Sequence, residues 1–200
     1  MASQHKASEQ KASLVRTVAI GASAGGINGL REVLPDLPVI PDCCLLIVVH
    51  LPPALRSFLP EVLSRAAHWE VRQARNGETL RAAVAHIAAP NFHLVLSGNQ
   101  LQLCSTALVL SQRPSVDVLF ESVAKERGAT AIGVLLSGAG RDGSEGLRSM
   151  KRSGGQTIVQ DPSEAMFPSM PAHGIETGCV DFVMPLRSIA PKISSLCAQG

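Results

Sequence analysis

The sequence has few aromatic and few charged residues, and each shortage argues against a class of function. Tyrosine is absent and aromatic residues make up 3% of the chain, so aliphatic side chains must build the core. So few aromatic rings leave little for single-stranded nucleic acid to stack on. The formal net charge of +2 is also too small for a surface that binds a phosphate backbone. We therefore expect no nucleic acid partner.

Long apolar runs and paired cysteines are also missing. The longest apolar stretch, Cys43–Val49, is far too short to span a bilayer, and the first fourteen residues contain no apolar run typical of a signal peptide. The five cysteines form no C-x-x-C motif, which favours reduced thiols over a zinc site. The sequence predicts a cytoplasmic protein that is not inserted in a membrane and holds no metal or organic cofactor.

What remains is a chain suited to forming one globular domain. It has 200 residues and a mass of 21.0 kDa, and 46% of its residues are hydrophobic. A domain of this size buries about 70% of the surface that its unfolded chain exposes. We predict a disordered polar leader over residues 1–14 and a single domain over residues 15–200.

Short apolar runs alternate with amphipathic stretches along the chain. Strands are predicted at 17–21, 44–50, 130–136, 157–160 and 181–184, and helices at 27–37, 55–67, 116–123 and 145–153. Almost continuously apolar strands that alternate with helices indicate a doubly wound α/β fold. Its sheet is mostly parallel and has helices on both faces.

The middle of the chain, about residues 71–104, has a different pattern. Its apolar runs are shorter and are separated by the turn-forming pairs Asn76-Gly77, Pro90-Asn91 and Gly98-Asn99. Such pairs are typical of tight turns between antiparallel strands. We therefore predict an antiparallel hairpin excursion in this region.

Three reactive side chains follow predicted strands. Ser23 comes just after the first strand, His50 closes the second, and Asp142 follows the strand that ends at Leu136. Ligands of doubly wound sheets bind beyond the carboxyl ends of the strands, so these residues are expected at one edge of the sheet. A hydroxyl, a base and a carboxylate in contact form the catalytic triad of serine hydrolases.

The segment around Ser23 supports a nucleophile but leaves alternatives open. Gly21-x-Ser23-x-Gly25 matches the G-x-S-x-G motif, in which a sharp strand-to-helix turn exposes the hydroxyl. Ser23 would also serve as a helix N-cap, and Asp142 with Glu145 resembles a capping box. Asp161 follows another strand and competes for the role of the carboxylate.

Other chemistries lack their motifs. The glycines match neither G-x-G-x-x-G nor a phosphate-binding loop, so no nucleotide site is predicted. No cysteine occupies a comparable loop near a histidine, which disfavours a thiol nucleophile. The remaining histidines lack metal-ligand spacing and are interpreted as structural or exposed: His5, His68, His86, His93 and His173.

Several separated segments, in order, resemble the catalytic domain of the CheB chemotaxis receptor methylesterases. They are VAIGASAGGINGLREVLPDLP, IVVHLPP, RPSVDVLFESVA, GVLLSGAGRDGSEGL, GGQTIVQDPSEAMFPSMPAHGI and GCVDFVMPL. The resemblance implies that Ser23 is the nucleophile, His50 the general base and Asp142 its carboxylate partner. It also implies hydrolysis of glutamate γ-methyl esters on methyl-accepting chemoreceptors, with release of methanol, and deamidation of receptor glutamines.

The chain departs from this family in several places. Family members commonly carry an N-terminal receiver domain, whereas this sequence has a short polar leader, so we expect a stand-alone catalytic domain. Ala24 stands where the family often has threonine, Ala139 replaces the methionine of G-M-G-x-D-G, and residues 167–171 replace a Gly-Met-Pro turn. The alternatives are a catalytically silent signalling module of the same fold, or an esterase or amidase for another substrate. The sequence does not indicate an oligomeric state.

Overall fold

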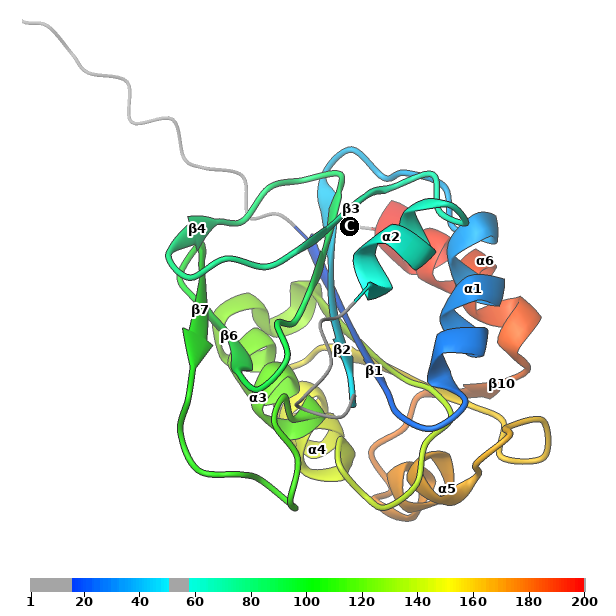
Figure 1. Cartoon of the computed structure of the whole chain (residues 1–200). Helices are drawn as coiled ribbons and strands as arrows, with labels where there is room; N and C mark the ends of the chain where they lie inside the picture. The colour runs from blue at the N-terminus through cyan, green and yellow to red at the C-terminus, as the bar shows by residue number, and fades with distance from the viewer. Residues whose placement is uncertain (1–15, 51–57, 200) are drawn as a thin grey trace, which may run out of the picture.

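The computed structural model describes residues 16–50 and 58–199, and Figure 1 shows their arrangement. The strands are β1 (Arg16–Ala22), β2 (Cys43–Val49), β3 (Glu70–Gln73), β4 (Glu78–Thr79), β5 (Val84–Ile87), β6 (His93–Ser97), β7 (Gln100–Cys104), β8 (Ala131–Leu135), β9 (Gln156–Gln160) and β10 (Phe182–Met184). The helices are α1 (Gly26–Asp36), α2 (Leu59–Ser64), α3 (Val116–Arg127), the short 3₁₀ helix η1 (Gly128–Thr130), α4 (Ser144–Arg152), α5 (Ser169–Glu176) and α6 (Leu186–Ala198). The predicted leader at 1–14 and the start of the predicted helix at 55–67 lie outside the described residues.

The main sheet has seven strands in the order β10-β9-β8-β1-β2-β5-β3, and all neighbouring pairs are parallel. The two central strands are buried on both sides, because every residue of β2 and nearly every residue of β1 is shielded from solvent. Strands of that kind need helices on both faces of the sheet. The predicted doubly wound α/β fold is therefore confirmed.

Two apolar layers cover the two faces of this sheet. On one face, residues of α1, α2 and α6 pack against every second side chain of β1 and β2, among them Val18, Ile20, Leu45 and Ile47. Residues of α3 and α4 pack with the intervening side chains of the same strands on the opposite face. Figure 1 shows α1 and α6 on one side of the sheet and α3 and α4 on the other. No helix within the described residues is long and apolar enough to cross a bilayer.

The middle region combines two kinds of pairing. The predicted antiparallel excursion exists as a separate three-stranded sheet in the order β4-β7-β6. Two strands of the same region, β3 and β5, instead extend the main parallel sheet. The reason is burial: all four residues of β5 are buried, so this strand suits the interior of a parallel sheet. The sequence interpretation also omitted α6, whose interior contains Pro191.

A close contact at Gly21 determines how α3 lies on the sheet. A β-carbon built on Gly21 would lie 2.2 Å from Cγ1 of Val116, the first residue of α3. The helix N-terminus thus rests directly on the backbone of β1. Glycine is needed here for close approach, whereas the strained turn that follows uses Gly25, with φ of +75°.

Candidate active site

The three predicted residues gather at the carboxyl edge of the central strands. Ser23 comes one residue after β1 and His50 one residue after β2, while Asp142 lies in the loop between β8 and α4. Backbone hydrogen bonds continue the sheet past the strand ends: the His50 N–H donates to the Ala22 carbonyl at 3.1 Å, and the Ser23 N–H donates to the Ser137 carbonyl at 3.0 Å. This edge is where doubly wound sheets bind their ligands.

His50 and Asp142 are in direct contact. Nε2 of His50 lies 2.7 Å from Oδ2 of Asp142, and the two side chains are only 6% and 3% exposed. The other ring nitrogen of His50, Nδ1, is buried and has no hydrogen-bond partner among the residues that the structure describes. Because Asp142 occupies Nε2, the nitrogen left to accept a proton is Nδ1.

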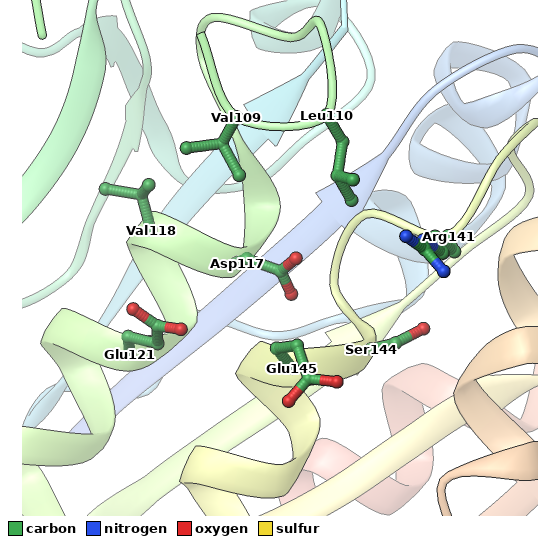
Figure 2. Close-up of a pocket in the computed structure, with 8 residues that line it drawn as sticks. All are labelled: Val109, Leu110, Asp117, Val118, Glu121, Arg141, Ser144 and Glu145. Atoms are coloured by element: carbon green, nitrogen blue, oxygen red, sulfur yellow. The ribbon is translucent and has the colours of Figure 1, made fainter. Parts of the chain in front are cut away.

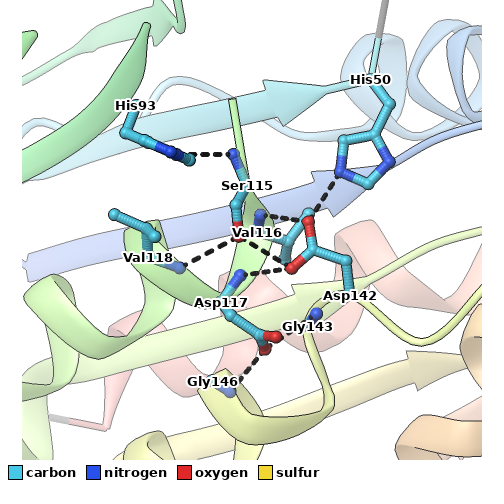
Figure 3. A network of polar contacts seen from close by, with 9 residues as sticks. All are labelled: His50, His93, Ser115, Val116, Asp117, Val118, Asp142, Gly143 and Gly146. Carbon is cyan, nitrogen blue, oxygen red and sulfur yellow. Dashed lines mark hydrogen bonds and ion pairs between the residues drawn. The ribbon is translucent and has the colours of Figure 1, made fainter. Parts of the chain in front are cut away.

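Asp142 is held by donors from the start of α3, as Figure 3 shows. Its Oδ1 accepts a hydrogen bond from the Ser115 hydroxyl at 2.9 Å and one from the Asp117 N–H at 2.9 Å. Its Oδ2 accepts one from the Val116 N–H at 2.8 Å in addition to the bond with His50. The capping-box interpretation was thus partly wrong, because Asp142 caps α3 and not α4, the helix that follows it.

These bonds keep Asp142 ionised. Burial alone would raise the pKa of the Asp142 carboxyl, but hydrogen bonds from His50 and from the backbone of Asp117 and Val116 outweigh burial and lower it. The positive end of the α3 dipole acts in the same direction. A charged, fixed carboxylate beside an imidazole can orient the ring and stabilise its protonated form.

A second buried carboxylate, Asp117, lies beside Asp142 and was missed by the sequence analysis. It stands in the first turn of α3, and its Oδ1 accepts hydrogen bonds from the Gly143 N–H at 2.9 Å and the Gly146 N–H at 2.8 Å. Burial and the nearby charge of Asp142 raise the pKa of Asp117 to about 7, although the two backbone bonds oppose this. The only sequence signal was its place in the segment RPSVDVLFESVA.

Ser23 is partly exposed and closely bordered by the loop that carries Asp142. A β-carbon built on Gly138 would lie 2.8 Å from Cβ of Ser23 and 2.3 Å from Sδ of Met170. Ser23 does not cap α1, whose N-cap is Gly25. Within the described residues, the Ser23 hydroxyl forms no hydrogen bond with His50. In ligand-free active sites, the bond between nucleophile and base often becomes short only when substrate binds.

Two pockets open at this edge of the sheet. One of about 330 Å³ is lined by His50, Leu110, Ser111, Gln112, Ala139, Gly140, Arg141 and Asp142. A neighbouring pocket of about 450 Å³ shares Leu110 and Arg141 with the first and reaches Asp117, as Figure 2 shows. A small ester entering the first pocket would therefore meet His50 and the glycine-rich loop that carries Asp142.

The remaining candidates lie apart from this contact. Asp161 accepts hydrogen bonds from the Ser163 N–H and hydroxyl, both at 2.8 Å. Within the described residues, it forms no hydrogen bond or ion pair with His50. His86 is buried in β5, where burial lowers its pKa to about 4, and His93 is buried in β6. No cluster of metal-ligating side chains is found in the described part of the chain.

Known proteins are similar to this chain in sequence and in fold. The family model for CheB methylesterase matches residues 18–193. The crystal structure of the Thermotoga maritima CheB methylesterase catalytic domain superposes with a TM-score of 0.86 at 30% identity, covering 90% of this chain and 98% of that one.

Curated relatives carry the name protein-glutamate methylesterase/protein-glutamine glutaminase. One from Photorhabdus laumondii is 37% identical over 92% of this chain, and one from Moorella thermoacetica is 38% identical over 91%. This chain covers 54% and 44% of their respective lengths, so it spans about half of the curated relatives that it matches.

Proposed function

The chain belongs to the CheB methylesterase family, and from this premise we propose that it is a serine esterase that hydrolyses γ-methyl esters of protein glutamate side chains. The proposed substrates are the cytoplasmic helices of methyl-accepting chemoreceptors, which assigns the enzyme to the cytoplasm. The observation that carries the proposal is the 2.7 Å contact between His50 and Asp142 at the sheet edge where Ser23 lies.

The proposed mechanism uses the three residues in sequence. Ser23 Oγ attacks the γ-carbonyl carbon while Nδ1 of His50 accepts the hydroxyl proton. The tetrahedral intermediate collapses, and His50 gives its proton to the departing methoxide, which leaves as methanol. Water, deprotonated by His50, then attacks the acyl-enzyme; as the ester bond to Ser23 breaks, His50 returns the proton to Oγ of Ser23 and glutamate is released. Asp142 stabilises the imidazolium that forms in each half-reaction.

Backbone N–H groups are proposed to stabilise the oxyanion. Ala24 follows the proposed nucleophile, and Ala139 follows Gly138, which closely approaches Ser23. Within the described residues, neither N–H donates a hydrogen bond, so both are left to bind an oxyanion. A pair of fixed donors at such a position lowers the barrier for acyl transfer, and it acts through the backbone, so alanine is sufficient at both positions.

The same residues support deamidation of glutamine. An amide presents the same γ-carbonyl to Ser23, and His50 would give its proton to the departing amide nitrogen, which leaves as ammonia in place of methanol. The relatives' names include protein-glutamine glutaminase, which agrees with this second reaction.

The first test is methanol release from methylated chemoreceptor membranes, with the wild-type chain compared with the Ser23→Ala variant. Wild-type release that falls by about 10³-fold or more in the variant would support both the reaction and the nucleophile. Near-wild-type release by the variant would exclude Ser23 as the nucleophile. If neither protein releases methanol, the proposed substrate is wrong, and a panel of small esters then separates another esterase from a silent signalling module.

A further inference from the structure

We propose that Asp117 is a positioning residue of the esterase site: it anchors the loop that carries Asp142 and so keeps Asp142 against His50. The inference rests on the proposed function, because it concerns the same triad. It starts from the Asp117 side chain in the first turn of α3, which the proposed mechanism does not use.

The first step in the argument is that α4 supplies no cap of its own. Its N-cap is Gly143, which has no side chain and a left-handed backbone with φ of +101°. The first N–H groups of a helix need acceptors from elsewhere. Asp117 provides one, because its Oδ1 accepts the N–H groups of both Gly143 and Gly146.

The second step is that the two carboxylates act reciprocally. Asp142, which precedes α4, accepts N–H groups from the start of α3, and Asp117, at the start of α3, accepts N–H groups from the start of α4. Figure 3 shows the two side chains side by side between the helix ends. Gly143 is bonded directly to Asp142 in the chain, so the bond from Gly143 to Asp117 fixes the backbone from which Asp142 projects.

The third step is that Asp117 remains close to water, although its side chain is largely buried. The residue is 6% exposed and lines the pocket of about 450 Å³ in Figure 2. The charged groups around it are Asp142 in the loop before α4, Glu121 on α3, Arg141 and Glu145 beside the pocket, and His50 beyond Asp142. Asp117 can therefore exchange its proton, and its charge acts on the Asp142–His50 pair.

Two substitutions separate anchoring from charge. Asp117→Ala removes the acceptor, so the loop is released, and the triad is expected to lose about 10- to 100-fold in reactivity, the size of effect produced by a small misplacement. Asp117→Asn keeps an oxygen acceptor and the same shape, so it should restore reactivity to within about 3-fold of wild type near neutral pH. A failure of Asn to restore reactivity would overturn the anchoring role.

The readout is chosen to be independent of the natural substrate. The rate at which a fluorophosphonate probe labels Ser23 reports the reactivity of the triad, and methanol release is measured in parallel. Labelling without methanol release would overturn the proposed substrate and leave the Asp117 inference standing. Equal labelling rates for wild type and Asp117→Ala would overturn the inference alone. No labelling of the wild type would overturn both.

A pH series and a matched control exclude a merely structural effect. Above about pH 7 the wild type gains a charge at Asp117 that favours the imidazolium, so the labelling-rate ratio of wild type to Asp117→Asn should rise with pH. A constant ratio would contradict the role of the charge. Asp181→Ala removes a carboxylate that lies just before β10 and accepts the N–H of Thr157 in β9, and this variant should leave labelling unchanged. If Asp117→Ala does not fold, Asp117→Asn still decides, because a labelling rate far more than about 3-fold below wild type near neutral pH would overturn the anchoring role.

Discussion

Two carboxylate clusters at opposite ends of the sheet use the same contacts for different purposes. Asp181, just before β10, accepts hydrogen bonds from the Thr157 N–H and hydroxyl at 3.0 Å and pairs with Lys151. Asp142, beyond β8, also accepts backbone N–H groups and a hydroxyl, but its last partner is His50. The Asp181 cluster ends at a half-exposed ammonium group, whereas the Asp142 cluster ends at a buried ring nitrogen with no partner among the described residues.

The difference teaches how a reactive site is distinguished from a structural one. Buried polar groups are normally paired, and an exception in a well-packed protein needs an explanation. Both carboxylates stabilise strand or helix ends, so their own hydrogen bonds do not identify a site. Within the described residues, buried ring nitrogens without a hydrogen-bond partner also occur in His86. The unpaired Nδ1 of His50 therefore marks a site only together with the place of His50, which lines a pocket and contacts Asp142.

The largest expected effect comes from breaking the Asp142 cluster. Asp142→Asn places an amide beside Nε2 of His50, and we expect kcat for ester hydrolysis to fall by about 10³- to 10⁴-fold. Asp161→Asn is the matched control, because Asp161 bonds to Ser163 and should leave kcat almost unchanged. The opposite ranking of the two variants would mean that the wrong carboxylate has been chosen.

Breaking the Asp181 cluster should affect stability and not activity. Asp181→Ala leaves a Thr157 N–H without its side-chain acceptor, and the free energy of unfolding is expected to fall by about 1–3 kcal/mol. Burial alone would raise the pKa of Asp181, but the bonds from Lys151 and Thr157 lower it. Its contribution is therefore present above about pH 4 and is lost as the pH falls further. Urea unfolding at several pH values measures both effects, and a loss of kcat would contradict this assignment.

The smallest expected effect is a pH-dependent change in melting temperature caused by Asp117, the buried carboxylate beside Asp142. Its pKa is raised from 3.8 to about 7, so the proton is bound more tightly in the folded state. That stabilisation is complete below about pH 4 and is lost as the pH rises through about 7. The melting temperature of the wild type should therefore fall across this window relative to that of Asp117→Asn. For a chain of this size, each kcal/mol corresponds to about 2–4 °C. Parallel melting curves at all pH values would contradict the raised pKa.

The sequence predicted those features that depend on local pattern. The apolar runs that became β1, β2 and β8 were continuous enough to identify central parallel strands, and their ends placed Ser23, His50 and Asp142 at one edge. The three residues are far apart in sequence but lie at one edge of the sheet, because the carboxyl ends of parallel strands all lie at the same edge. The roles of the three residues stay predictions until they are tested.

Features that depend on contacts between distant segments could not be predicted in this way. Asp142 has a capping pattern toward the helix that follows it, but the acceptor is used by α3, which comes earlier in the chain. Asp117 looks like an ordinary acidic residue in a first helical turn, and its partners at Gly143 and Gly146 are distant in sequence. Similarly, β5 carries a histidine, His86, within a short run, so its burial in the main sheet was not evident.

The contact between Gly21 and Val116 has a consequence for mutational scanning. Gly21→Ala would push α3 away from β1, and with it the N–H groups that hold Asp142. Such a variant would lose activity as a nucleophile variant does, although Gly21 takes part in no chemical step. A second substitution, Val116→Ala, should compensate, because it removes the methyl groups that the new β-carbon at position 21 would meet. In a library, these two positions should be varied together, and activity regained in the double variant would separate lost space from lost chemistry.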